Sequence, residues 1–483
     1  MFLGIDIGTS SVKAVLTDAD GAVAGSASRP CTVSRPHPLW SEQEPEDWVA
    51  AAVAAVDELA ERRPADLAGV LGIGFSGQMH GAVLLGADNR VLRPAILWND
   101  GRSHRQCATL EETLPTLRAI SGNIAMPGFT APKLLWVAEE EPETFAALAK
   151  VLLPKAYVRW RFTGAMVEEM SDASGTLWLD VGRRDWSDDL LAATRMTRAH
   201  MPDLAEGSDA VAQLSPELAR RWGMKTPPLV AGGAGDCAAS AVGLGAITPG
   251  DGFLSLGTSG VVWRTTDRFL PNPAMAVHAF CHALPGVWHQ MGVMLSSAAS
   301  LAWAASTLGA PEAELLAPLG DAVDGPSPVA FLPYLSGERT PHNDATVRGL
   351  FAGLSAETTR DAMVQAVLEG VAFASRDNLV ALGEGAPTVF DLAGGGSRSR
   401  LWARICADAL GVTIHRIEDG EVGAALGAAH LGRMAATGES PATVCRKPRR
   451  LETFTPDPAR AEAYSQAWLR WRRLYPLAKE FAS

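Results

Sequence analysis

Two turns rich in glycine and hydroxyl side chains are the parts of this chain best suited to bind phosphate. The first, Gly8-Thr9-Ser10, separates an apolar run from a β-branched run, and Gly257-Thr258-Ser259 repeats the pattern about half the chain later. Both are typical of the tip of a β-hairpin. A tip that begins with glycine can present several backbone N–H groups to an oxyanion. The repeat predicts a duplicated fold that grips one polyphosphate from two sides, and chance repetition of a common hairpin is the alternative.

The two copies differ in charge at one position. The first copy has Asp6 there, and the second has Ser255. A carboxylate beside a phosphate-binding turn can hold Mg²⁺ directly or through water, where the ion would bridge the β- and γ-phosphates. We therefore predict that Asp6 binds the metal. The alternative is a turn aspartate without a ligand.

Length and composition limit the classes of protein that fit. A chain of 483 residues predicts two large domains or three small ones, and we place the main boundary so that the domains are 1–247 and 248–483. At 47% hydrophobic and 20% charged residues, the composition is that of a globular protein. The net charge of −12 argues against a nucleic-acid partner. Phosphate must then be bound by backbone donors and a metal rather than by a basic channel.

The cysteines and the apolar segments bear on the compartment. The six cysteines are spread along the chain without a C-x-x-C pair, which favours a reducing compartment over a disulfide framework. No apolar stretch reaches the roughly 18 residues that a transmembrane helix needs, and the N-terminus has no basic, cleavable leader. We expect a cytoplasmic protein with no membrane partner.

Strands and helices alternate in the expected pattern of an α/β fold. Four predicted strands lead directly into polar or glycine-rich turns, and these strands lie at 70–75, 94–98, 227–231 and 389–393. Ligands of open α/β sheets usually bind beyond the carboxyl ends of the strands. Apolar periodicity predicts helices at about 46–60, 131–141, 238–244, 295–309, 356–382, 401–410, 421–429 and 457–475.

Several longer motifs resemble those of a known family. The sequence has no P-loop pattern, and no G-x-G-x-x-G of the Rossmann type at a predicted strand–helix junction. The motifs lie at residues 34–43, 77–81, 97–102, 128–137 and 336–342. In these motifs the chain resembles the FGGY carbohydrate kinases of the actin-like ATPase superfamily and, among them, the bacterial xylulokinases. The resemblance runs from residue 2 to about residue 432.

The resemblance implies an α/β fold of two actin-like, ribonuclease H-like domains. Each would have a mixed β-sheet flanked by helices, with the active-site cleft between the domains. Domain 1–247 would bind the sugar and the metal, and domain 248–483 would bind the adenine nucleotide and close with an amphipathic helix. The implied reaction is ATP-dependent phosphorylation of the 5-hydroxyl of D-xylulose, which gives D-xylulose 5-phosphate.

Asp236, just before a predicted helix, is the candidate catalytic base that accepts the proton of the sugar hydroxyl. We expect the helix dipole to keep its carboxylate ionised and its pKa low. A weak base suffices, because little proton transfer need precede a loose transition state. Capping of the helix by the Asp236 side chain is the structural alternative, and both roles can hold together.

The substrate-binding residues predicted from the motifs are Gln78, Met79, His80, Asp100, Asp236 and Cys237. His80 would bond to a sugar hydroxyl, and Met79 would form an adaptable apolar wall. Asp100 either lines the same cleft or simply pairs with Arg102. Cys237 departs from the family, which usually carries Asn there, and a thiol is a poor hydrogen-bonding substitute for an amide.

ATP is predicted to lie between the two hairpins and the third glycine-rich turn. The ATP-binding residues predicted there are Thr9, Ser10, Lys13, Gly257, Thr258, Ser259, Gly395, Gly396 and Ser399. Adenosine would lie against the bare backbone of Gly394-Gly395-Gly396. Hinge closure between the two domains would exclude water and suppress futile hydrolysis of ATP.

Two alternatives stay open at this point. One is a kinase of the same family that acts on another ketose or on a polyol. The other is an actin-like ATPase that serves as a chaperone or filament without a sugar substrate, against which the Gln78-Met79-His80 cluster argues. The sequence leaves the oligomeric state open, a homodimer included.

Overall fold

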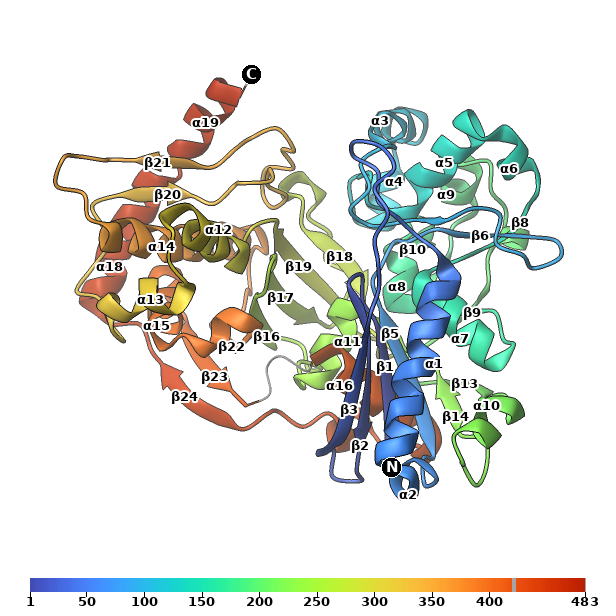
Figure 1. Ribbon diagram of the computed structural model, residues 1–483. Helices are drawn as coiled ribbons and strands as arrows, with labels where there is room; N and C mark the ends of the chain where they lie inside the picture. The colour runs from blue at the N-terminus through green and yellow to red at the C-terminus, as the bar shows by residue number, and fades with distance from the viewer. Residues whose placement is uncertain (419–422, 483) are drawn as a thin grey trace.

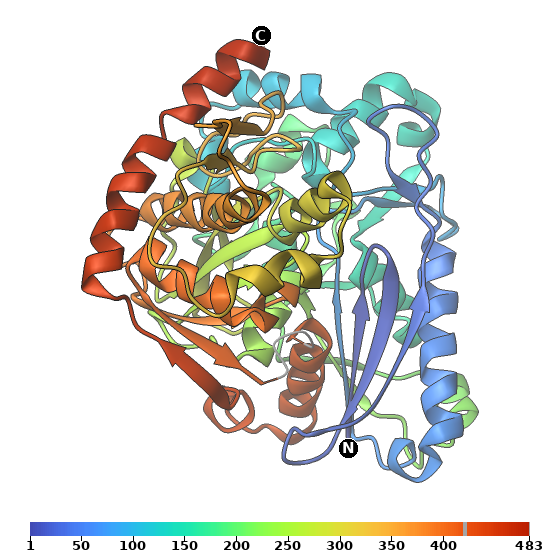
Figure 2. The same ribbon diagram turned by 60° about the vertical axis from the view of Figure 1, so that its left-hand side comes forward.

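Two seven-stranded mixed sheets, one in each half of the chain, form the centres of two lobes (Figure 1). The structure, a computed structural model, describes residues 1–418 and 423–482. Seen from a second side, the last two helices run along the outer edge of the C-terminal lobe (Figure 2). The two-domain α/β fold that the motifs implied is confirmed.

The N-terminal sheet combines an antiparallel hairpin with parallel strands. Its strands are β1 (Phe2–Ile7), β2 (Ser11–Thr17), β3 (Val23–Pro30), β5 (Gly72–Gly77), β13 (Ala210–Gln213), β14 (Leu229–Ala231) and β15 (Ala234–Gly235). They lie in the order β13-β14-β5-β1-β2-β3, and β15 pairs with the end of β5. β1, β2 and β3 are antiparallel neighbours, whereas β5 runs parallel to β1 and to β14.

The C-terminal sheet repeats this arrangement. Its strands are β16 (Gly252–Leu256), β17 (Gly260–Thr266), β18 (His278–Cys281), β19 (Trp288–Met294), β22 (Val389–Ala393), β23 (Thr413–Ile417) and β24 (Arg450–Phe454). Their order is β18-β19-β17-β16-β22-β23-β24. β16, β17 and β19 are antiparallel neighbours, and β22 runs parallel to β16 and to β23. β16-β17 therefore corresponds to β1-β2, as the repeated turns predicted.

Helices and short strand pairs surround the two sheets. The N-terminal helices are α1 (Pro45–Arg62), α2 (Pro64–Leu67), α3 (His104–Thr113), α4 (Leu117–Ser121), α5 (Thr130–Glu140), α6 (Pro142–Ala146), α7 (Pro154–Thr163), α8 (Met170–Ser174), α9 (Asp188–Ala193), α10 (Pro216–Arg221) and α11 (Asp236–Gly243). The later helices are α12 (Ala298–Leu308), α13 (Glu312–Leu316), α14 (Arg360–Ala381), α15 (Arg400–Leu410), α16 (Gly423–Thr437), α17 (Pro441–Val444), α18 (Pro458–Trp471) and α19 (Leu474–Ala482). Among the described helices, none is both long and apolar enough to cross a membrane.

Five strand pairs lie outside the main sheets. They are β4 (Glu42–Gln43) with β7 (Ala95–Ile96), β6 (Val83–Gly86) with β8 (Leu148–Leu152), β9 (Val167–Glu169) with β12 (Asp203–Ala205), β10 (Leu179–Asp180) with β11 (Asp185–Trp186), and β20 (Ala330–Leu332) with β21 (Leu350–Ala352). The strand expected at 94–98 is thus only a two-residue pairing.

The helix predicted at about 457–475 is present as α18, but its predicted end was wrong, because two helices occupy this part of the chain. α18 ends at Trp471, and α19 begins at Leu474. Pro476 lies in the first turn of α19. Proline lacks the N–H that a continuous helix would need there and its ring clashes with the preceding turn. The chain therefore breaks and starts a second helix.

α16 belongs to the C-terminal half of the sequence but packs against the N-terminal sheet and α11 (Figure 1). Its contacts are backbone to backbone. A Cβ at Gly74 of β5 would lie 1.8 Å from the carbonyl oxygen of Ala428, and a Cβ at Gly427 would lie 1.8 Å from that of Ala239 in α11. The close packing predicted for the small residues at 421–429 is confirmed from Gly423 onward, and residues 421–422 lie outside the described residues.

Substitution of Gly427 by alanine is expected to destabilise the protein. The added methyl group would have to displace the backbone of α11, and overpacking of this kind costs about 1–3 kcal/mol or more. A lower midpoint in urea or thermal unfolding, read by circular dichroism, would show it. Gly325→Ala is the matched control, because a Cβ at Gly325 has no heavy atom within 4 Å. Equal midpoints for the two variants would contradict the close contact.

Candidate active site

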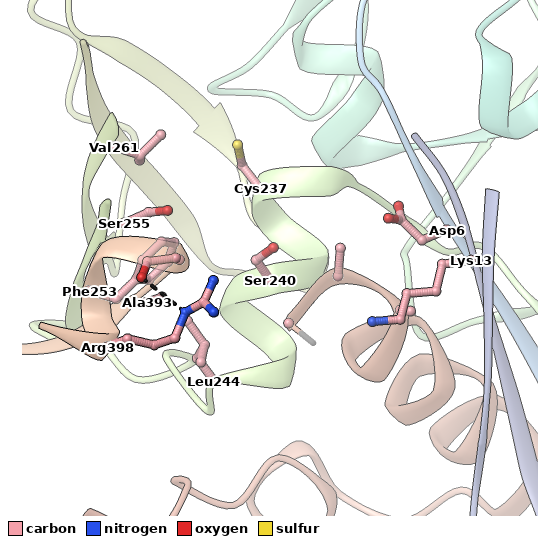
Figure 3. Close-up of a pocket in the computed structure, with 15 residues that line it drawn as sticks. Asp6, Lys13, Cys237, Ser240, Leu244, Phe253, Ser255, Val261, Ala393 and Arg398 are labelled. Atoms are coloured by element: carbon pink, nitrogen blue, oxygen red, sulfur yellow. Dashed lines mark hydrogen bonds between the residues drawn. The ribbon is translucent and has the colours of Figure 1, made fainter. Parts of the chain in front are cut away.

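A cavity of about 390 Å³ separates the two lobes and is lined from both (Figure 3). Asp6 and Lys13 project from the N-terminal hairpin, whereas Phe253, Ser255 and Val261 come from the C-terminal hairpin. α11 and the start of α16 form the base of the cavity with Cys237, Ser240, Leu244, Gly423, Ala424 and Ala425. The equivalent positions of the two repeats, Asp6 and Ser255, thus face one space, as the duplicated hairpins predicted.

A second cavity of about 1090 Å³ adjoins the first on the C-terminal side. Gly395 and Arg398 line both cavities, so the two are neighbours along one path. The wall of the second cavity includes the apolar residues Ala298, Leu301, Ala302, Leu316, Ala317 and Leu401. Of the predicted ATP-binding residues, it brings together Gly257, Thr258, Gly395, Gly396 and Ser399. The larger cavity thus offers an apolar surface to a flat ring, and the smaller one has Asp6, Lys13 and Arg398 for a charged tail.

The backbone around the third glycine-rich turn leaves room only for glycine at position 394. Gly394 has a φ of 80°, and a Cβ there would lie 2.7 Å from the carbonyl carbon of Leu256. The turn continues as a short 3-10 helix at Gly395–Arg398, and the Ser399 hydroxyl then caps α15 by accepting from the N–H of Trp402. Ser399 therefore shapes the cavity wall while its hydroxyl is used by the helix. Ser259 is exposed and lies at the lining of neither cavity.

Asp6 lies near the end of β1 with its carboxylate turned toward the cavity (Figure 3). The Ser76 hydroxyl donates to its Oδ1 over 2.8 Å, and Lys13 is its direct partner across the hairpin. Burial raises the pKa of Asp6, and the Ser76 hydrogen bond and the Lys13 charge offset part of this. A half-buried carboxylate that borders a polar cavity is a suitable ligand for a hard cation such as Mg²⁺. Ser76 was not predicted as a site residue, although it directly follows the strand predicted at 70–75.

Asp236 is the first residue of α11, and its position differs from the one expected. Gly235 is the N-cap of α11, so the capping by Asp236 that was the structural alternative is not observed. The carboxylate accepts from the N–H of Cys237 over 2.7 Å. Burial, together with the charge of Asp6, raises the pKa of Asp236 to about 6. The low pKa expected from the helix dipole was therefore wrong, because desolvation outweighs the dipole at this site.

A buried charged cluster that the sequence did not reveal holds the segment before Asp236. The Ser171 hydroxyl accepts from the N–H of Gly235 and donates to Glu169. Lys155 Nζ lies 2.8 Å from Glu168, 3.1 Å from Glu169 and 3.5 Å from Asp172. These carboxylates could hold a metal by their spacing, but the ammonium group of Lys155 already lies among all three, and burial raises the pKa of Asp172 well above its usual range. The cluster thus fixes the start of α11 from behind.

Met79 and His80 lie directly after β5, where ligands of such sheets bind. His80 has a φ of 70°, and the start of α5 holds its carbonyl through Thr130 and through Lys133 Nζ at 2.8 Å. Burial lowers the pKa of His80 to about 3. The neutral ring donates from Nδ1 to the Gly175 carbonyl at 2.7 Å, which leaves Nε2 as an acceptor. Strained backbone of this kind clusters at functional sites.

Asp100 is fully engaged inside the N-terminal lobe. One oxygen accepts from the N–H and Nε of Arg102, and the other accepts from Arg102 Nη2 and from the N–H of Ser41. The guanidinium of Arg102 also lies 3.6 Å from the centre of the Trp40 ring. Of the two roles considered for Asp100, the structure therefore supports pairing with Arg102, which anchors the loop at 34–43.

Both halves of the chain match one protein family. The N-terminal domain of the FGGY family of carbohydrate kinases matches residues 1–243, and its C-terminal domain matches residues 252–436. The chain is 48% identical to the xylulose kinase of Escherichia coli K12, over 98% of each chain.

Solved structures agree with this match. The structure of a xyloylose kinase from Brucella ovis is 51% identical, with a TM-score of 0.96 and 99% of each chain covered. A gluconate kinase from Lactobacillus acidophilus is 25% identical, with a TM-score of 0.92 over 99% of this chain and 98% of that one. The same fold therefore serves more than one polyhydroxy substrate.

Proposed function

The chain belongs to the FGGY family of carbohydrate kinases, and we propose that it phosphorylates D-xylulose on its 5-hydroxyl with ATP. The observation that carries the proposal is the cavity between the two hairpins, which adjoins a larger one in the C-terminal lobe and has at its base the helix that begins with Asp236. Near-full-length identity of 48% to the xylulose kinase of Escherichia coli supports D-xylulose as the sugar.

We place the nucleotide along the path of the two cavities. Adenosine would occupy the larger one against Gly395, Gly396 and the apolar residues of its wall, and the β- and γ-phosphates would occupy the smaller one. Lys13 and Arg398 supply positive charge at its two sides. Asp6, the carboxylate lining this cavity, would hold Mg²⁺, which neutralises charge on the phosphates as phosphoryl transfer proceeds.

Asp236 would accept the proton of the sugar hydroxyl as that oxygen attacks the γ-phosphorus. A base with a pKa near 6 is mostly ionised at pH 7 and yet strong enough to take a proton late in the reaction. Met79 and His80 would line the sugar site, where the Nε2 of His80 accepts from a hydroxyl. Closure of the lobes over both substrates would exclude water, and so favour transfer to sugar over hydrolysis.

A second candidate is a kinase of another ketose or of a polyol. It is favoured by Cys237, which lines the cavity where the resemblance predicts an Asn, and by the gluconate kinase that shares the fold. Burial raises the pKa of the Cys237 thiol well above its usual range. The thiol is therefore neutral and forms weaker hydrogen bonds than an amide.

The six cysteines are all free, in keeping with a reaction that we place in the cytoplasm.

A sugar panel with ADP release as the readout tests the proposed function. D-xylulose is expected to give the highest kcat/KM among ketopentoses, glycerol and gluconate. Asp236→Ala should lower kcat by about 10²-fold or more, because a positioned base contributes that much, while binding of MgATP in calorimetry stays close to that of the native protein. A higher kcat/KM for another substrate would favour the second candidate, and ADP release that is independent of sugar would favour an actin-like ATPase.

Activity is expected to fall as pH drops through about 6, the pKa of Asp236. The raised pKa means that the carboxylate is protonated below this pH and cannot accept a proton. Below the midpoint, kcat/KM should fall about tenfold per pH unit, measured with the concentration of MgATP²⁻ held constant. Burial lowers the pKa of His80 to about 3, so this group does not titrate in the same range. A flat profile down to pH 5 would contradict the assignment.

Cys237→Asn is expected to lower the KM for D-xylulose. An amide would restore the hydrogen bond that the thiol makes poorly, and a bond of this kind contributes about 0.5–1.5 kcal/mol, or roughly 2- to 10-fold. Steady-state kinetics at saturating MgATP would measure it. Cys237→Ala serves as the control and should leave the KM nearly unchanged or raise it. An unchanged KM in Cys237→Asn would place the side chain out of contact with the sugar.

A further inference from the structure

A buried amide joins the phosphate hairpin to the segments around it. Gln43, in β4, donates from Nε2 to the carbonyl oxygens of Thr9 at 2.8 Å and Thr32 at 3.2 Å. Its Oε1 accepts from Trp48 Nε1 and from Gln78 Nε2, each at 3.0 Å. Gln43 is only 3% exposed, and these four bonds use both amide hydrogens and both acceptor sites. The side chain is therefore held in one orientation.

The same network uses the side chains of Thr9 and Gln78. The Thr9 hydroxyl donates its single hydrogen to Gln78 Oε1 at 2.9 Å and accepts from Trp98 Nε1 at 3.0 Å. Gln78 is 2% exposed, and its backbone N–H bonds to the carbonyl of Ile7 at the end of β1. A ligand that replaced either partner in the Thr9–Gln78 bond would leave the other, part-buried side chain short of a hydrogen bond, which costs about 1–3 kcal/mol.

We infer that Thr9 and Gln78 act as one positioning unit, braced by Gln43, and that neither side chain is a separate ligand for phosphate or sugar. Gln78 immediately precedes Met79 and His80, on the sugar side, whereas Thr9 forms the tip of the phosphate hairpin. The unit fixes the distance between the turn that would carry the sugar and the turn that would carry the phosphates. The side-chain roles predicted for Thr9 in ATP binding and for Gln78 in sugar binding are replaced by this joint role.

The physical consequence is a loss of rate rather than of affinity. Phosphoryl transfer depends on the alignment of acceptor and donor, and a misplacement of about 1 Å can cost 10²-fold in rate. Loosening of the unit would leave the backbone N–H groups of the hairpin and the turn after β5 in place but let them shift relative to each other. The inference rests on the proposed function, since its test measures the rate of sugar phosphorylation.

A double-mutant cycle tests the inference. Thr9→Val and Gln78→Leu should each lower kcat by about 10- to 100-fold, while the Kd for MgATP in calorimetry changes by less than about threefold. Because both variants remove the shared Thr9–Gln78 hydrogen bond, the double variant should be no more than about threefold slower than the slower single variant. Losses that multiply, with a raised Kd for MgATP in Thr9→Val and a raised sugar KM in Gln78→Leu, would overturn the inference.

Matched variants separate positioning from simple loss of stability. Thr9→Ser keeps the hydroxyl and should retain kcat. Gln43→Leu alters a residue that would touch neither substrate, and it should lower kcat as Gln78→Leu does. Gln290→Leu is the matched control, because it removes another buried amide, which donates to the Leu270 carbonyl in the C-terminal lobe. This control should leave kcat unchanged. Equal kcat for Gln43→Leu and Gln290→Leu would overturn the inference. An inactive native protein with D-xylulose would instead overturn the proposed function, and the cycle would then use the sugar that the panel identifies.

Discussion

The contact between α16 and the backbones of β5 and α11 is the constraint on which the site depends. Gly74 and Gly427 allow this helix to approach both partners without side chains between them. α11 begins at Asp236, and the start of α16 lines the same cavity as Asp6. The depth of the cavity and the place of the candidate base are thus set by one close packing, made by a helix from the second half of the chain against the sheet of the first.

The two hairpins have the same fold but have diverged in what supports them. The tip of the first is braced from behind, since Thr9 bonds to Gln78 and Trp98, and Gln43 holds its carbonyl. The tip of the second has exposed hydroxyl side chains, and Thr258 lines the larger cavity. The carboxylate also occurs in the first copy alone. Side chains therefore hold the first tip, whereas backbone N–H groups of Ser297 and Ala298 hold the carbonyls of the second, and the two repeats differ in support as well as in charge.

Much of the fold and part of the site could be predicted from the sequence, because they depend on local patterns. The repeated turns and the strands beside them follow from glycine, hydroxyl and β-branched residues in fixed order, and Asp6 stands out as the single acidic difference. The bonds of Gln43 to Thr9 and Gln78 join residues that are 34 and 35 positions apart. No periodicity predicts such contacts, nor the Lys155 cluster behind Asp236, because only the folded chain brings these residues together.

The pKa of Asp236 shows how a local rule can fail for a physical reason. A helix start should favour the ionised carboxylate, yet burial and the charge of Asp6 act in the opposite direction and outweigh it. Asp6 and Asp236 therefore influence each other through their charges. The pKa of Asp236 depends on the ionisation of Asp6 as well as on its own burial, and neither dependence can be seen from its place at a helix start.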